Sequence, residues 1–164
     1  MALDILGVEH IRIYQDSLFW KRAGDGPTPW HSDARMAPFD TNHMLTLWIP
    51  LHDTSNGLVF ASGSHIDFAL QYWHDADGDL DERYEERHHL PLRAGDVTVH
   101  AGWTLHCADV ASHDRWALAV TLVDATAPIR ADIDAKGDSE DRWSYGDWVK
   151  EVPIKSRQWD HPKV

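Results

Sequence analysis

Short strand-like segments dominate the chain, and the periodicity of helices is scarce. Several segments, including residues 44–49, show the alternation that a half-buried strand requires. Turn-forming residues separate the segments, as at 24–27, 55–57, 63 and 94–96. The strands that we predict cover residues 11–14, 18–21, 30–33, 44–51, 58–62, 89–92, 97–100, 104–108 and 116–123. Many short strands joined by such turns predict an all-β, cupin-like jelly roll of two sheets, with a few short helices.

Two further segments have a different character. A short helix is predicted over residues 66–73, and residues 75–86 carry seven acidic residues against one arginine. The acids at 75, 77, 79 and 86 match positions 1, 3, 5 and 12 of a calcium-binding EF-hand loop. However, Leu80 replaces the glycine that the sixth position needs, and no helix pair flanks the loop. We therefore expect a solvated loop and no calcium site.

The length of 164 residues fits one domain, which we expect to span residues 1–164. The last part, residues 130–164, is polar and mixed in charge, and Trp143, Tyr145, Trp148 and Trp159 are spaced along it. Aromatic side chains at such intervals can anchor a segment to a core. We therefore expect an irregular C-terminal extension packed on the core.

The chain carries 15 basic and 27 acidic residues, a net charge of −12. This balance argues against nucleic acid or an anionic membrane as a partner. A basic and apolar leader is missing from the first residues, and the sequence has no apolar run of roughly 20 residues. The only cysteine is Cys107, so an internal disulfide cannot form. We expect a cytoplasmic protein that acts on a small molecule.

A metal site is indicated by His31 and Asp33, which lie two residues apart at the end of a predicted strand. Side chains with this spacing on a strand point to one face and could share an ion. A second histidine from a later strand would complete a 2-His-1-carboxylate triad, which leaves positions open for a cosubstrate and O₂. His106 and His100 both compete for this role. Alone, however, the His-x-Asp pair also fits a surface histidine beside a hydrogen-bonded aspartate.

The downstream context supports the metal site. After the turn at 94–96 and the strands at 97–100 and 104–108, Arg115 opens the last apolar strand, nine residues after His106. Its planar guanidinium could bind the far carboxylate of a 2-oxo dicarboxylic acid whose other end chelates the metal. The alternative is a surface salt bridge.

These features resemble the phytanoyl-CoA dioxygenase family. The matching stretches are Lys21, Pro29–Asp33, residues 47–51, residues 57–65, residues 95–106, and Ser144-Tyr145 with Trp148. The resemblance implies a double-stranded β-helix that uses iron(II), 2-oxoglutarate and O₂ to hydroxylate a small organic substrate, with release of succinate and CO₂. It also implies that His31, Asp33 and His106 bind the metal and that Arg115 binds the far carboxylate of 2-oxoglutarate. Lys21 and Trp48 match positions that contribute to the 2-oxoglutarate pocket in relatives.

The resemblance also bears on the reaction and on the rival histidines. Related halogenases have a small residue in place of the ligand carboxylate, so Asp33 predicts hydroxylation. His100 lies 15 residues before Arg115, an interval that fits the family pattern badly, so the resemblance favours His106. His65 more naturally closes a turn than binds a metal.

Two departures from the family pattern lead to further expectations. The interval from His106 to Arg115 is short, so the loop between them should be tight. Relatives also carry a helical region before the segment that begins here, so the chain is either a compact member or a fragment. Either case would open one wall of the pocket, and we expect either a homodimer that closes it or poorly coupled turnover.

Two other functions remain open at this point. The chain could be a non-catalytic jelly-roll module that holds a metal or a ligand, or a truncated and inactive relative. Arg115 argues against a structural zinc site, because such sites are closed by four ligands and need no cationic anchor.

Overall fold

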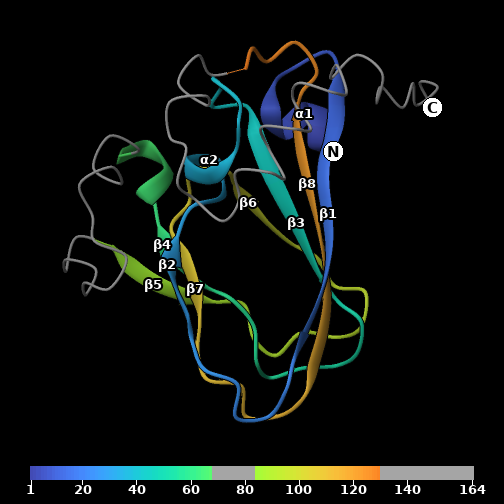
Figure 1. Ribbon diagram of the computed structural model, residues 1–164, viewed down its shortest axis with the longest axis vertical. Helices are drawn as coiled ribbons and strands as arrows, with labels where there is room; N and C mark the ends of the chain where they lie inside the picture. Colours follow the sequence, from blue (N-terminus) through green and yellow to red (C-terminus); the bar gives the residue numbers. More distant parts are fainter. Residues whose placement is uncertain (68–83, 130–164) are drawn as a thin grey trace.

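The computed structural model describes residues 1–67 and 84–129, in which two antiparallel sheets face each other across the molecule (Figure 1). The α-helices of this part are α1 (Ala2–Leu6) and α2 (Asp33–Met36), and residues 64–67 form a 3₁₀ turn. Its strands are β1 (Ile11–Lys21), β2 (Thr28–His31), β3 (Met44–Pro50), β4 (Val59–Ser62), β5 (Glu85–His88), β6 (Thr98–Ala101), β7 (His106–Ala108) and β8 (Arg115–Asp124).

The strand order is β1-β8-β3-β6 in the first sheet and β2-β7-β4-β5 in the second. The chain moves from one sheet to the other at most of its connections, as a jelly roll requires. The predicted all-β jelly-roll fold with short helices is therefore confirmed for the described residues.

The inner face of the first sheet leaves room for a pocket. Side chains alternate along β8, so Arg115, Ala119 and Thr121 point between the sheets. The neighbouring strand β3 directs Thr46 and Trp48 to the same side. Small residues such as Ala119 in the middle of β8 keep the space between the sheets open.

A buried apolar cluster closes the sandwich beyond this space. It comprises Ala34, Ala37, Phe39, Met44, Trp103 and Val123. Tyr14 packs against it, with its ring edge-on to Phe39 at 5.0 Å between centroids. Because the cluster includes residues of α2, of β3 and of the turn after β6, it fixes α2 against the first sheet.

The outer face of the first sheet carries exposed apolar side chains. Trp20 on β1 and Trp116 on β8 are cross-strand neighbours, and their rings stack at 5.0 Å with an interplanar angle of 4°. Each is more than a third exposed, as is Leu18. The homodimer expected from the sequence stays a prediction.

Residues 11–21 form one strand, and the prediction of two separate strands was wrong. The predicted break falls at Gln15, Asp16 and Ser17, but these residues pair with β8 throughout. A bulge between Ile13 and Gln15 shifts the register and lets Gln15 and Ser17 face the pocket. Their polarity suits a pocket wall and does not mark a loop.

Other elements also differ from the predictions: β7 begins at His106 and not at residue 104, and Glu85 and Glu86 of the predicted acidic loop belong to β5. The strand predicted at 89–92 is wrong, because β5 ends at His88 and Leu92 forms only an isolated bridge with Thr54. Pro91 has no N–H group with which to continue a ladder. The strand predicted at 30–33 ends at His31, and Asp33 opens α2. Helix α1 was not predicted.

Some predictions fall outside the described residues. These are most of the helix at 66–73, most of the acidic loop at 75–86, and the extension at 130–164; the single-domain organisation of residues 1–164 is likewise untested. Within residues 1–67 and 84–129, none of the helices is both long and apolar enough to cross a membrane.

Candidate functional site

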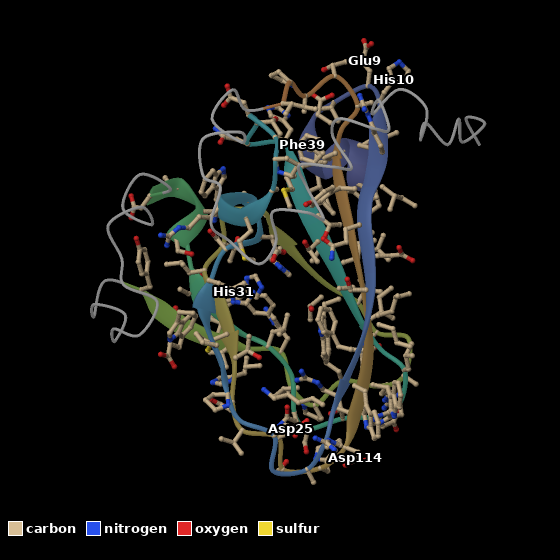
Figure 2. The ribbon with its side chains drawn as sticks, viewed as in Figure 1. Glu9, His10, Asp25, His31, Phe39 and Asp114 are labelled. Carbon is tan, nitrogen blue, oxygen red and sulfur yellow. The ribbon has the colours of Figure 1, made fainter. Side chains whose placement is uncertain are left out.

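His31, Asp33 and His106 meet at one end of the space between the sheets. His31 ends β2, Asp33 opens α2 and His106 begins β7, which pairs with β2. Nε2 of His31 and Nε2 of His106 lie 3.9 and 3.7 Å from Oδ1 of Asp33. One ligand atom from each residue lies within 4.8 Å of the other two. In Figure 2, His31 points between the sheets, whereas Asp25 and Asp114 lie at the loops of the far end.

Backbone hydrogen bonds orient both imidazoles of this group. Nδ1 of His31 lies 2.8 Å from the carbonyl oxygen of Pro29, and Nδ1 of His106 lies 2.9 Å from that of Thr104. Because a carbonyl oxygen only accepts, each Nδ1 carries the hydrogen and donates it. In the neutral form of each ring the lone pair then lies at Nε2, which is the arrangement of histidines that bind metals.

The surroundings also set the charges of the group. Burial lowers the pKa of His106 to about 3, with smaller contributions from His100 and His31, although Asp33 acts in the opposite direction. Burial by itself would raise the pKa of Asp33. Hydrogen bonds from His100 and Thr46, together with electrostatic interactions with His106 and His100, outweigh the effect of burial and hold this pKa well below its usual value.

The group therefore brings together three electron-pair donors: two imidazole nitrogens and one carboxylate oxygen. With both rings neutral, no hydrogen lies between the three atoms, and a cation is the partner that would satisfy all of them. Two histidines and one carboxylate form the facial donor set of non-haem iron sites. The residues fit a metal ion.

Arg115 lies at the other end of the pocket and is 4% exposed. Its Nη1 donates to Oδ1 of Asn56 at 2.9 Å and to the carbonyl oxygen of Gly57 at 3.2 Å. Its Nε is buried without a hydrogen-bond partner. Among the described residues, no carboxylate forms an ion pair with Arg115. A buried cation without a counter-ion is costly, so the pocket favours an anionic ligand here.

Trp48 and Lys21 lie next to Arg115. The guanidinium carbon of Arg115 is 5.1 Å from the centroid of the Trp48 ring, which is a cation–π contact. Lys21 is the β-ladder partner of Arg115, and its amine donates to the carbonyl oxygen of Asp109 at 2.9 Å. Burial, and to a smaller extent the charge of Arg115, lowers the pKa of Lys21. Trp48 lines the pocket, whereas Lys21 is turned towards the loop after β7.

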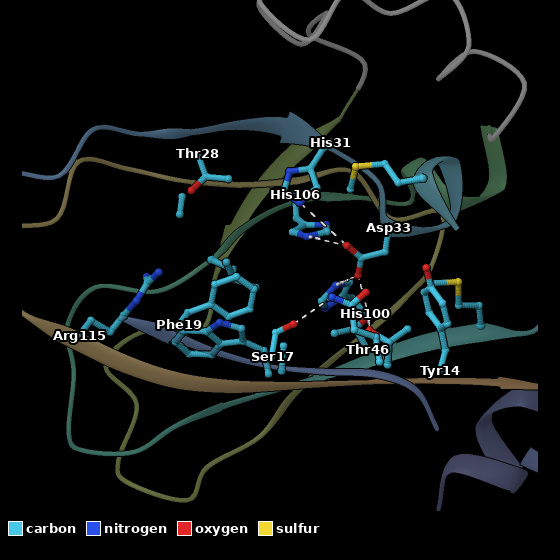
Figure 3. Close-up of a pocket in the computed structure, with 18 residues that line it drawn as sticks. Tyr14, Ser17, Phe19, Thr28, His31, Asp33, Thr46, His100, His106 and Arg115 are labelled. Carbon is cyan, nitrogen blue, oxygen red and sulfur yellow. Dashed lines mark hydrogen bonds and ion pairs between the residues drawn. The ribbon is translucent and has the colours of Figure 1, made fainter. Parts of the chain in front are cut away.

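The pocket that joins the two ends has a volume of about 320 Å³ and lies within the sandwich (Figure 3). This volume is in the range typical of small-molecule sites. The lining residues are Tyr14, Gln15, Ser17, Phe19, Thr28, His31, Asp33, Met36, Met44, Thr46, Trp48, Leu58, His100, His106, Ala108, Arg115, Ala119 and Thr121.

The structure adds residues that the sequence did not indicate. Asn56 holds Arg115, although its segment was predicted only as a turn. The hydroxyl of Thr46 donates a hydrogen bond to the carboxylate of Asp33, although the segment of Thr46 was predicted only as a strand. Its hydroxyl at an inward position of an apolar strand was the one local signal for such a role. His65 lies outside the group of metal-ligand candidates found among the described residues.

Comparison with protein families gives one match, in which the phytanoyl-CoA dioxygenase family covers residues 2–114. No match is found among curated proteins. The sequence-based resemblance to this family is therefore confirmed.

Solved structures with the same fold include three enzymes. The chain is similar to the non-heme alpha ketoglutarate dependent epimerase SnoN from nogalamycin biosynthesis, with 27% identity, 79% of this chain and 53% of that chain covered, and a TM-score of 0.63. For the carbocyclase SnoK from the same biosynthesis, the identity is 24%, the coverages are 84% and 60%, and the TM-score is 0.63. For EctD from S. alaskensis, the identity is 16%, the coverages are 79% and 50%, and the TM-score is 0.61.

The chain thus spans between 50% and 60% of the length of these three chains. At these identities, the likeness to SnoK and EctD concerns the fold alone. Another structure of SnoN, at 26% identity, contains Fe³⁺, alpha ketoglutarate and a nogalamycin compound. Its iron and 2-oxoglutarate agree with the predicted cofactors.

Proposed function

Since this chain belongs to the phytanoyl-CoA dioxygenase family, we propose that it is a non-haem iron(II), 2-oxoglutarate-dependent dioxygenase. One observation carries the proposal. Three electron-pair donors converge at one end of the pocket, and a buried arginine that lacks an acidic partner among the described residues lies at the other. A small dicarboxylate whose 2-oxo acid end meets the metal and whose far carboxylate meets Arg115 would satisfy both ends.

Each site residue has a role in this proposal. His31, Asp33 and His106 hold iron(II), and Arg115 binds the far carboxylate of 2-oxoglutarate. Trp48 stacks under the guanidinium and Lys21 adds positive charge beside it. Bound iron(II), with 2-oxoglutarate and O₂, supplies the oxidising chemistry that converts a substrate C–H bond to C–OH while succinate and CO₂ are released.

The substrate that we propose is a small, uncharged organic molecule. Apart from the histidines, the charged residues that line the pocket are Asp33 and Arg115, and both already have roles. Much of the remaining lining is apolar or aromatic, as at Phe19, Met36 and Leu58. A charged substrate would find no counter-ion among these lining residues, and burying an unpaired charge is unfavourable.

The proposal is tested by anaerobic calorimetry with iron(II), followed by measurement of succinate after addition of 2-oxoglutarate and O₂. We expect one iron per chain and iron-dependent succinate release. His31→Ala, Asp33→Ala and His106→Ala should each abolish stoichiometric iron binding, because two ligands hold the ion poorly. His65→Ala, a histidine outside the group, is the matched control. Iron binding without any succinate release would instead support a non-catalytic binding module.

The reaction type needs a separate measurement, because similar enzymes include an epimerase and a carbocyclase. We expect the product of a converted substrate to be heavier by one oxygen atom, and this atom to come from ¹⁸O₂. A product of unchanged mass would contradict hydroxylation while leaving the oxygenase class intact.

A further inference from the structure

His100 contacts the carboxylate of Asp33 at a different oxygen from the other two histidines, and its ring centroid lies 4.4 Å from that of His106. It lies on β6 with 5% of its surface exposed. Its Nε2 is 3.2 Å from Oδ2 of Asp33, whereas His31 and His106 face Oδ1. Figure 3 shows His100 and Thr46 below the carboxylate and His31 and His106 above it. The two oxygens of Asp33 therefore have different surroundings.

The hydrogen positions separate His100 from the other two imidazoles. An ionised carboxylate oxygen only accepts hydrogen bonds, so Nε2 of His100 carries the hydrogen and donates it to Oδ2. This nitrogen then has no lone pair for a metal. In contrast, His31 and His106 donate from Nδ1 to backbone carbonyls, which leaves Nε2 of the neutral ring available to a metal. The contact thus makes His100 a partner of the ligand and not a ligand.

The hydroxyl groups of Thr46 and Thr121 form a second set of hydrogen bonds that fixes Oδ2 of Asp33. The hydroxyl of Thr46 on β3 donates to Oδ2 at 2.6 Å. The hydroxyl of Thr121 on β8 lies 3.1 Å from that of Thr46, and it donates to Thr46 because the hydrogen of Thr46 is already used. Three adjacent strands, β6, β3 and β8, thereby fix one oxygen of a carboxylate carried by α2.

The orientation of Asp33 matters for the number of ligand positions. A carboxylate that turned both oxygens to the metal would take two positions, and the three that a facial triad leaves open would be reduced. We propose that His100, together with Thr46, is a positioning residue that holds Oδ2 so that Asp33 presents only Oδ1 to the metal. This inference rests on the proposed function, because it places the metal at His31, Asp33 and His106.

The test compares Thr46→Val and His100→Ala with the unaltered protein. Calorimetry gives the stoichiometry and dissociation constant for Co(II), and the visible absorption of bound Co(II) reports its coordination number. We expect each variant to bind one Co(II) about 10- to 100-fold more weakly, as losses of hydrogen bonds to metal ligands do. We also expect an altered Co(II) spectrum, which a general loss of stability would not produce.

Two variants control for folding. Thr46→Ser keeps the hydroxyl and should retain the affinity and the spectrum of the unaltered protein. Thr98→Val removes a buried hydroxyl from the same strand as His100, and this hydroxyl has no hydrogen-bond partner among the described residues. Thr98→Val should change neither the affinity for Co(II) nor the spectrum of bound Co(II).

The outcomes separate the inference from the proposed function. Unaltered affinity and spectrum in Thr46→Val and His100→Ala would overturn the inference alone. If His100→Ala lost the metal while His106→Ala kept one ion, His100 would be a ligand, and both the inference and the triad would be wrong. If the unaltered protein bound no metal, the proposed function would fail and the inference with it.

Discussion

At the scale of single residues, Arg115 shows how a buried charge indicates a ligand. Its Nη1 is taken by Asn56 and Gly57, while its Nε lacks a hydrogen-bond partner. The two protein acceptors are neutral, so they hold the guanidinium in place without cancelling its charge. A carboxylate would supply both the missing charge and the missing acceptors.

Arg115→Lys tests this role. The lysine keeps the charge but loses the planar pair of donors, so the dissociation constant for 2-oxoglutarate should rise at least about tenfold, or about 1.4 kcal/mol. Iron affinity should barely change. Calorimetry of the iron-loaded protein provides the measurement, and Arg22→Lys, at an exposed arginine, is the control. Equal binding of 2-oxoglutarate by both variants would show that Arg115 does not bind this cosubstrate.

At the scale of elements, the turn after β6 sets the place of α2. The N–H of Gly102 donates to the carbonyl oxygen of Met44 at 2.7 Å, and the N–H of Ala34 donates to that of Gly102 at 2.8 Å. This pair of bonds links β3 to α2 through Gly102. Asp33, which precedes Ala34, is therefore positioned by a contact between segments far apart in the sequence.

Gly102→Ala should disturb this arrangement. An added Cβ would lie 3.0 Å from Cβ and Cγ of Met44 and 3.1 Å from Cβ of Ala34. Overpacking of this kind costs about 1–3 kcal/mol in the free energy of unfolding, and the shift of α2 should also weaken metal binding. Urea unfolding measures the first effect. Gly26→Ala, where the added Cβ meets no atom within 4 Å, should be nearly neutral, and equal stability of the two variants would contradict the prediction.

At the scale of the whole molecule, the candidate metal site joins structures from both sheets. Two ligands come from paired strands of the second sheet, and the third is held by threonine and histidine side chains of the first. An ion bound here would connect the sheets in the folded state and lose its site on unfolding. Metal binding should therefore raise the free energy of unfolding.

We expect Mn(II) at 100 times its dissociation constant to raise the free energy of unfolding by about 2.7 kcal/mol. Denaturant unfolding in the presence and absence of the ion measures the difference. His106→Ala should remove the increase, whereas His65→Ala should keep it. An equal increase in both variants would mean that the ion binds at a different site, one that does not include His106.

Local patterns were sufficient for the fold class and indicated His31, Asp33 and Arg115, whereas Lys21, Trp48 and the choice of His106 came from the family resemblance. Strands alternate with period two and turns need particular residues, so both can be recognised within a few positions of the sequence. The order and spacing of His31, Asp33, His106 and Arg115 can also be read directly from the sequence. The errors arose where a local pattern had two causes, as in the polar residues of β1, which face a pocket and not a loop.

The family resemblance favoured His106 over His100, but the contacts that distinguish the two side chains are seen only in the tertiary structure. Both are buried histidines that lie near each other in sequence, and both approach Asp33. They face different oxygens of the carboxylate, and Nδ1 of His106 bonds the Thr104 carbonyl oxygen whereas Nδ1 of His100 has no hydrogen-bond partner among the described residues. These contacts depend on how β6 pairs with β3 and how β7 pairs with β2. Because the hydrogen bond from His100 to Asp33 spans 67 positions of the chain, strand pairing decides it and no neighbouring residue encodes it.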